Sequence, residues 1–119
     1  MSHIVTIKTQ IRDELAVQAA CRRLQLLPAE QGEFELFRTR ATGLAVRLHS
    51  WTYPVVCDLQ AGELQYDNFE GHWGEQRYLD QFLQAYAVEK TLLEARRQGY
   101  SAFEQPLENG SIRIQIQTN

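Results

Sequence analysis

The dipeptide Asn109-Gly110 constrains the fold more than any other local feature of the sequence. It separates two strand-like segments, 102–107 and 112–117, and both of its residues tolerate the positive φ angles that a type I′ hairpin turn requires. Isoleucine occupies every second position from 112 to 116. This alternation predicts a strand with one buried and one solvated face. We therefore expect a hairpin that closes an antiparallel sheet, with a fixed register because a one-residue slip would expose every isoleucine.

The remaining segments predict two helices and five more strands. The β-branched stretch 3–9 indicates a strand, and Asp13 is a suitable N-cap for a helix that ends near residue 26. A second helix is expected over 75–98, where Gly99 provides a stop signal. The other strands are expected at 33–38, 44–49, 55–59 and 63–66, with a turn at Thr42-Gly43.

These elements follow one another through short connections, which favour antiparallel neighbours. The expected order is β-α-β-β-β-β-α-β-β. We predict an α+β fold, a mostly antiparallel sheet with two helices packed on one face. The 119 residues fit one domain, 1–119.

Composition argues against several functional classes. The net charge of −3 is unlike the basic excess of a nucleic-acid-binding protein. No apolar run approaches the roughly 20 residues that a membrane helix needs, and no signal peptide precedes the first strand. A cytoplasmic protein with no membrane contact is expected. Cys21 and Cys57 are expected to be buried, reduced thiols, because their spacing matches neither a disulfide framework nor a zinc site.

Candidate catalytic and metal sites have weak support in the sequence. Tyr86 and Lys90 have the spacing of a dehydrogenase proton-transfer pair, but the glycine-rich nucleotide turn of such enzymes is absent after the first strand. A core tyrosine and a solvated lysine are the better interpretation. His49 and Ser50 are adjacent, so in a strand they would point to opposite faces. The histidines and cysteines lack metal-ligand spacing. We predict no catalytic residues, no metal and no cofactor.

Three arginines, Arg38, Arg40 and Arg47, flank the turn expected at Thr42-Gly43. A cluster of them across that turn would suit a phosphate or an acidic partner. A solvated face of arginines is the favoured interpretation.

The loop 67–74 combines aromatic, acidic and imidazole side chains with two glycines. Aromatic residues with a few polar groups are common in pockets and at interface hot spots. The candidate binding residues are Trp51, Tyr53, Asn68, Phe69, His72 and Trp73. The alternative is a loop that folds its aromatic side chains back onto the core. If the loop instead walls a small-molecule pocket, then His72, Asp67 and Glu70 are its candidate proton carriers.

Two stretches carry a family resemblance. The opening Met1-Ser2-His3-Ile4-Val5-Thr6-Ile7-Lys8-Thr9-Gln10-Ile11 and the run from Tyr86-Ala87 through Arg96-Arg97-Gln98-Gly99-Tyr100 resemble the small cyanobacterial, planctomycete and plastid proteins known as conserved hypothetical chloroplast reading frame thirty-five. That family is described as of unknown function, and its members are small, soluble and encoded near an AAA-type ATPase. No catalytic residues are defined for it. The resemblance implies an accessory or partner-binding role.

These observations favour a non-enzymatic accessory domain that binds another protein, with an AAA-type ATPase as a candidate partner. Aromatic side chains of the loop would fill a pocket on that partner. A small-molecule binder or an enzyme with the loop as a pocket wall is the alternative. Self-association through the C-terminal strand is also open, because residues 112–117 are expected to present an unpaired sheet edge.

Overall fold

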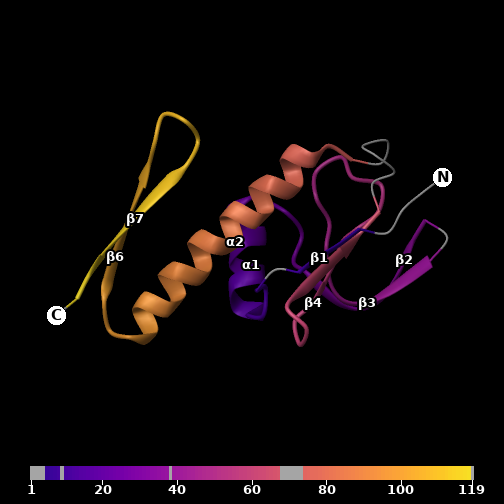
Figure 1. Cartoon of the computed structure of the whole chain (residues 1–119), viewed down its shortest axis with the longest axis horizontal. Helices are drawn as coiled ribbons and strands as arrows, with labels where there is room; N and C mark the ends of the chain where they lie inside the picture. The colour runs from indigo at the N-terminus through magenta and orange to yellow at the C-terminus, as the bar shows by residue number, and fades with distance from the viewer. Residues whose placement is uncertain (1–4, 9, 38, 68–73, 119) are drawn as a thin grey trace.

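The computed structural model describes residues 5–8, 10–37, 39–67 and 74–118 (Figure 1). It confirms the α+β class and the order of the elements. In chain order these are β1 (Val5–Lys8), α1 (Glu14–Arg23), β2 (Glu30–Leu36), β3 (Thr39–Val46), β4 (Val55–Asp58), β5 (Glu63–Tyr66), α2 (Gln76–Arg97), β6 (Ser101–Pro106) and β7 (Ile112–Gln117).

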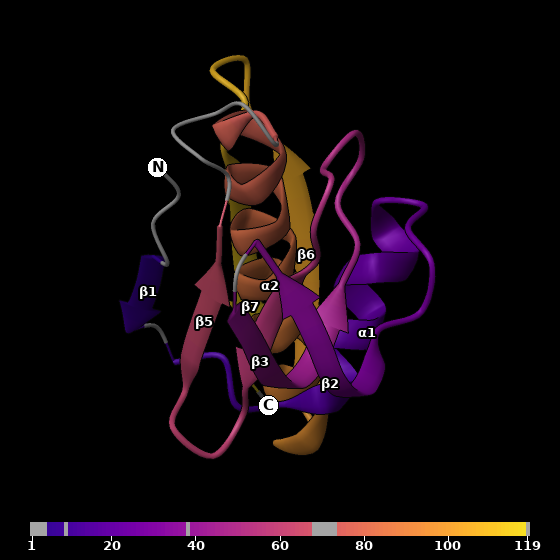
Figure 2. The same cartoon turned by 90° about the vertical axis from the view of Figure 1, so that its right-hand side faces the viewer.

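The first five strands form one antiparallel sheet in the order β1-β5-β4-β3-β2. Both helices cover the same face of this sheet, as predicted (Figure 2). The core between them joins α1, α2 and the strands through residues such as Val17, Phe82, Leu44, Val55 and Leu64, all almost fully buried. Burial of these apolar side chains is the main force that holds the helices on the sheet.

The prediction of a turn at Thr42-Gly43 is wrong. β3 runs straight through Gly43, which lies opposite Gly32 of β2, and the chain reverses after Phe37. Glycine is needed at position 43 for close approach, since an added Cβ would lie 2.4 Å from the Cys57 carbonyl oxygen. A glycine inside a strand often marks such an approach rather than a turn.

The opposite face of the sheet carries a smaller cluster of Leu36, Ala41, Ala45 and Val56, with Phe34 and Tyr53 packed against it. Arg40 and Arg47 are both exposed and do not contact one another, which agrees with the favoured interpretation of a solvated arginine face, and Arg38 lies outside the described residues. Arg40 bonds to Glu33, 2.8 Å away across β2 and β3. The Arg47 guanidinium lies 5.9 Å from the centre of the Phe34 ring.

α2 extends well beyond the sheet. Its 22 residues span roughly 33 Å at the usual helical rise, and its residues in the main core cluster lie between Leu79 and Tyr86. The molecule is therefore elongated, 52 Å along its longest axis. Its radius of gyration is 15.1 Å, against roughly 13.5 Å expected for a compact domain of this length.

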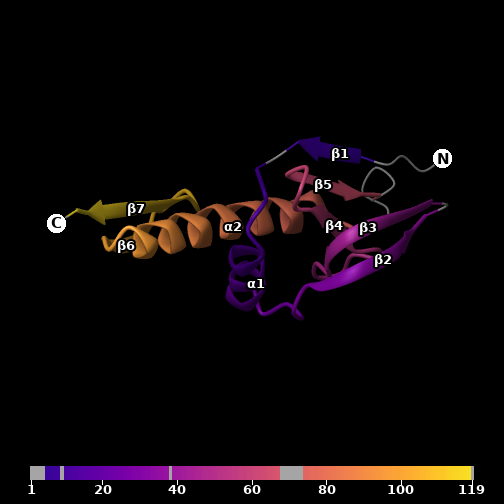
Figure 3. The same ribbon diagram turned by 90° about the horizontal axis from the view of Figure 1, so that it is seen from below.

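The C-terminal half of α2 carries the β6–β7 hairpin on its side, at the opposite end of the molecule from the five-stranded sheet (Figure 3). The hairpin forms a two-stranded sheet of its own. It does not close the main sheet as predicted. Its inner face is covered by α2 instead, where Val88 and Ala95 are buried outside the main core cluster. Gln84, one turn before Val88, donates to the Gly110 carbonyl oxygen.

The hairpin turn also differs from the expected type I′. Gly110 has a φ of 87°, but Asn109 is not among the residues with positive φ. Gly110 N donates to Leu107 O, and Leu107 N donates to Ser111 O. This is the pattern of a three-residue loop that ends in a glycine bulge. The Asn109 side chain accepts from Ser111 N, which further fixes the loop.

Candidate functional site

Trp51, the first of the predicted binding residues, packs into the fold. Its indole Nε1 donates to the Glu75 carbonyl oxygen over 3.0 Å, and its ring meets Tyr66 edge-on at 5.5 Å. A Cβ at Gly74 would lie 2.4 Å from the Trp51 ring, so glycine is required where the chain passes it. Trp51 therefore fastens the start of α2 to the end of the sheet.

Tyr53 lies in a different cluster. It packs with the smaller cluster on the helix-free face of the sheet, 6.5 Å from the Phe37 ring, whereas Trp51 packs against the helix-covered core. The structure therefore does not bring Trp51 and Tyr53 together. The other four predicted residues, Asn68, Phe69, His72 and Trp73, lie outside the described residues, as does Glu70. Asp67, just before them, is buried with 1% of its surface exposed.

His49 contacts neighbouring groups of the fold, and the two cysteines are buried. His49 Nε2 lies 3.1 Å from the Leu24 carbonyl oxygen, and its ring meets Tyr78 edge-on. Cys21 and Cys57 are free and buried, as predicted. Among the residues that the structure describes, no group of three His, Cys, Asp or Glu side chains could hold a metal ion.

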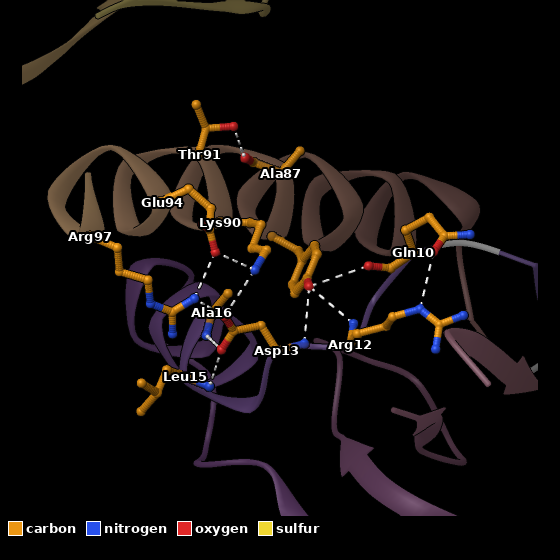
Figure 4. A network of polar contacts seen from close by, with 11 residues as sticks. Gln10, Arg12, Asp13, Leu15, Ala16, Ala87, Lys90, Thr91, Glu94 and Arg97 are labelled. Atoms are coloured by element: carbon orange, nitrogen blue, oxygen red, sulfur yellow. Dashed lines mark hydrogen bonds and ion pairs between the residues drawn. The ribbon is translucent and has the colours of Figure 1, made fainter. Parts of the chain in front are cut away.

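The densest polar network joins the two helices (Figure 4). Asp13 caps α1 by accepting from Leu15 N and Ala16 N. Its other carboxylate oxygen accepts from Lys90 at 3.0 Å and from Arg97 at 2.9 Å, both on α2. The same two cations contact Glu94, so two carboxylates and two cations alternate across the helix–helix contact.

Tyr86, one turn before Lys90 on α2, holds the chain that enters α1. Its buried hydroxyl accepts from Arg12 N at 3.1 Å and from Asp13 N at 3.2 Å. The guanidinium of Arg12 in turn donates to the carbonyl oxygens of Gln60 and Ala61 in the β4–β5 turn. Tyr86 is thus a core tyrosine, as predicted, while Lys90 is ion-paired rather than simply solvated.

Ion pairing shifts the pKa values of this network toward the charged forms. Burial raises the pKa of Asp13, but hydrogen bonds from Lys90 and Arg97 outweigh it, and the result lies below the ordinary value of 3.8. Hydrogen bonds to Glu94 and Asp13 raise the pKa of Lys90 above its ordinary value of 10.5. A protonated lysine held between two carboxylates is a poor base or nucleophile at neutral pH. The network therefore fits a structural clamp better than a reaction centre.

Two open clefts follow one side of α2 next to this network. The larger, of about 520 Å³, lies between Gln10-Ile11 and the helix at Leu83, Ala87 and Thr91. The smaller, of about 290 Å³, lies farther along, between the helix and the hairpin residues Tyr100 and Ile116. Lys90 and Thr91 line both clefts, so the two clefts are neighbours along one face of α2.

The hairpin beside the smaller cleft exposes two large apolar side chains. Phe103 is 57% exposed and Ile116 is 45% exposed. On the face turned away from α2 the side chains are mostly uncharged: Ser101, Phe103, Gln105, Arg113, Gln115 and Gln117. The neighbours of Phe103 on this face carry amide and hydroxyl groups except Arg113, which lies diagonally across from it. Depletion of charge around an aromatic side chain is typical of the centre of a protein interface.

One ion-pair chain fixes the hairpin to the rest of the molecule. Arg23, at the end of α1, contacts Glu104 of β6 at 2.7 Å and Glu89 of α2 at 3.1 Å. The hydrogen bond from Arg23 lowers the pKa of Glu104. Arg23 therefore fixes β6 to both helices, whereas β7 lines the smaller cleft through Ile116.

Reasoning from sequence missed the hairpin as a surface. The alternation of isoleucine predicts burial within one antiparallel sheet, and position 103 enters that prediction only as part of the strand 102–107. A signal was present, because Phe103 alternates out of phase with the α2-facing side chains of its own hairpin.

Neither helix of the described chain has the length and apolar character of a membrane span.

No protein-family model, curated protein or solved structure matches this chain. Its function is therefore inferred from its own geometry.

Proposed function

We propose that this chain is a non-enzymatic accessory domain that binds another protein, and that the outer face of the β6–β7 hairpin is its principal binding surface. The exposure of Phe103 on a face with one charged side chain, Arg113, carries this proposal. Aromatic side chains in uncharged surroundings are the usual hot spots of protein interfaces. A two-stranded hairpin has little stability of its own, so contact with a partner would also stabilise the hairpin.

The family resemblance adds an AAA-type ATPase as the partner to test first. The loop residues Asn68, Phe69, His72 and Trp73 are a second proposed surface. Trp51 is a weak member of that surface because its ring is committed to Glu75, Tyr66 and Gly74. Tyr53 packs on the helix-free face of the sheet, whereas Trp51 packs on the helix-covered face. This argues against a single surface that includes both Trp51 and Tyr53.

A small-molecule site is the second candidate function, and the 520 Å³ cleft beside Tyr86 favours it by its size. The polar groups at its rim are already engaged, since Lys90 bonds to two carboxylates and the Tyr86 hydroxyl to the backbone of 12 and 13. Protein binding is therefore the better supported proposal.

Affinity purification of the tagged wild-type protein from its native cell would identify the partner, and variants would then locate the surface. We expect Phe103→Ser to lower recovery of that partner at least about tenfold, the usual cost of losing a hot-spot aromatic. Leu27→Ser is the matched control, because Leu27 is also a highly exposed apolar side chain but lies between α1 and β2. Full recovery with folded Phe103→Ser, and loss with Phe69→Ala and Trp73→Ala together, would move the surface to the loop.

A further inference from the structure

The two edges of the β6–β7 hairpin differ in their free hydrogen-bonding groups. Leu107 N donates to Ser111 O over 2.8 Å, so this pair is hydrogen-bonded. Hydrogen-bonded and non-hydrogen-bonded pairs alternate along an antiparallel ladder. The next pair, Pro106 and Ile112, is therefore non-hydrogen-bonded. It follows that the N–H and C=O groups of 112, 114 and 116 point away from β6, toward the open edge of β7.

The same alternation turns the backbone groups of Ala102, Glu104 and Pro106 toward the other edge, that of β6. That edge is a poor template for another strand. Pro106 has no N–H to donate, and proline is a common device that blocks pairing at an edge. The Glu104 side chain is tied to Arg23 of α1. β7 is thus the competent edge, and within the described part of the chain β6 is its only strand partner.

Apolar surface flanks this open edge. Ile116 of β7 lines the 290 Å³ cleft together with Tyr100 and the α2 residues Thr91 and Ala95. Because Ile116 belongs to β7, the cleft lies beside the open β7 edge, whereas Arg23 fixes the other strand, β6, to α1 and α2. A strand added to β7 would therefore bring whatever follows it over the cleft.

We infer that the β7 edge is a self-association site, at which β7 of a second copy of this chain pairs antiparallel to form a four-stranded sheet in the order β6-β7-β7-β6. This inference rests on the proposed function, that the hairpin binds protein, and names a second copy as the occupant of one edge. Strand addition at an open edge supplies main-chain hydrogen bonds, and the alternate side chains supply specificity.

The strand is complementary to itself, which favours a second copy over an unrelated peptide. With Ile114 on the two-fold axis, Ile112 of one copy lies opposite Ile116 of the other, and the outward N–H and C=O groups of all three isoleucines find partners. Arg113 then lies opposite Gln115 of the second copy. No like charges oppose one another across the new pair, and apolar pairs directly opposite are favourable.

The helices also fit this arrangement. A two-fold axis perpendicular to the sheet leaves both α2 helices on the same face of it. Neighbouring strands lie about 4.8 Å apart, so the centres of the two hairpins would be separated by about 10 Å. That separation is close to the usual distance between packed helices, about 8–10 Å. Each α2 would thus cover the apolar cleft of the other.

Charge variants at Gln115 test the register without disturbing the monomer, because this side chain is exposed on the outer face. The measurement is sedimentation equilibrium of the full chain at low ionic strength, from micromolar to near-millimolar concentration. We expect a reversible dimer for the wild type. Gln115→Glu, opposite Arg113, should tighten it about threefold to tenfold, and Gln115→Lys should weaken it by a similar factor. Ser101→Lys, on the outer face of β6, is the matched control and should leave the dimer unchanged.

Ile114→Pro removes the outward N–H at the two-fold axis and should leave a monomer. Circular dichroism and the unfolding midpoint establish whether this variant is folded, and the Gln115 variants decide the question if it is not. A wild-type monomer at every concentration overturns the inference, and so does a dimer indifferent to charge at 115. Either result leaves the proposed function intact if Phe103→Ser still lowers partner recovery by the expected factor, at least about tenfold. The converse pattern, a β7-edge dimer with full partner recovery by Phe103→Ser, would reject the outer-face surface alone.

Discussion

The Asp13 carboxylate lies 3.0 Å from the Lys90 ammonium and joins the first turn of α1 to the C-terminal half of α2. The same side chain accepts from two backbone N–H groups as the N-cap of α1. One residue thus begins a helix and fastens it to its neighbour. Removing the charge and removing the cap are separable changes.

We expect Asp13→Asn to lower the free energy of unfolding by about 1 kcal/mol, because asparagine still caps a helix but no longer attracts Lys90 and Arg97. Asp13→Ala should cost about 1 kcal/mol more, since the cap is lost as well. Urea denaturation of both variants measures the difference. Equal stability of the two variants would show that the cap contributes nothing.

The depressed pKa of Asp13 predicts acid sensitivity. A carboxyl group whose pKa is lower in the folded state contributes stability above its unfolded pKa, and this contribution is lost as the pH falls through the folded value. The wild type should therefore lose more stability than Asp13→Asn between about pH 5 and pH 2. Glu94 titrates in both proteins, so the difference between their urea midpoints across this range isolates Asp13. Parallel curves would contradict the prediction.

The Tyr86 hydroxyl is expected to contribute to stability through backbone groups that have no other partner in the fold as described. Tyr86→Phe leaves the N–H groups of Arg12 and Asp13 without their acceptor in a part-buried position. The expected loss is about 1–3 kcal/mol, measured by urea denaturation. Tyr78→Phe is the control, because the Tyr78 hydroxyl accepts from the exposed Arg77 side chain, and its effect should be small.

Local signals in the sequence predicted much of the fold. Asp13 is the N-cap of α1, and Gly99 follows the end of α2 with a φ of 77°. The alternation of isoleucine correctly indicated a strand with one covered face. It could not indicate the cover, because a helix and a second sheet both satisfy the same pattern. α2 supplies that cover, so the hairpin stands apart from the main sheet.

Predictions that depended on packing between distant segments fared less well. Trp51 and Tyr53 are two residues apart, yet they pack on opposite faces of the sheet. The local sequence around Gly43 predicted a turn. The actual reason for glycine there is the Cys57 carbonyl oxygen, which lies fourteen residues later in the chain and so does not show in the local pattern. The open edge of β7 depends on which residue pairs of the hairpin are hydrogen-bonded. The sequence does not indicate which pairs these are.

Gly43 should therefore be intolerant of a side chain, whereas the glycine opposite it should not. An alanine Cβ at 43 would lie 2.4 Å from the Cys57 carbonyl oxygen and 3.0 Å from Val56. We expect Gly43→Ala to cost about 2–3 kcal/mol or more through forced movement of β4. Gly32→Ala, whose Cβ would meet the Phe34 ring at 3.4 Å, is the matched control and should change stability by less than about 1 kcal/mol. Equal effects on the urea midpoint would contradict the close approach.

The buried thiols should be inert while the protein is folded. Burial, with a smaller contribution from nearby Cys21, raises the pKa of Cys57 to about 12, and burial also raises the pKa of Cys21. Because the thiolate is the reactive form, both should resist iodoacetamide at about pH 8 and react only when the chain unfolds. Mass spectrometry after timed labelling measures this. Ser101→Cys supplies an exposed thiol as an internal reference, and labelling of Cys57 in the folded protein at the rate of that reference would show that the core opens far more readily than its packing implies.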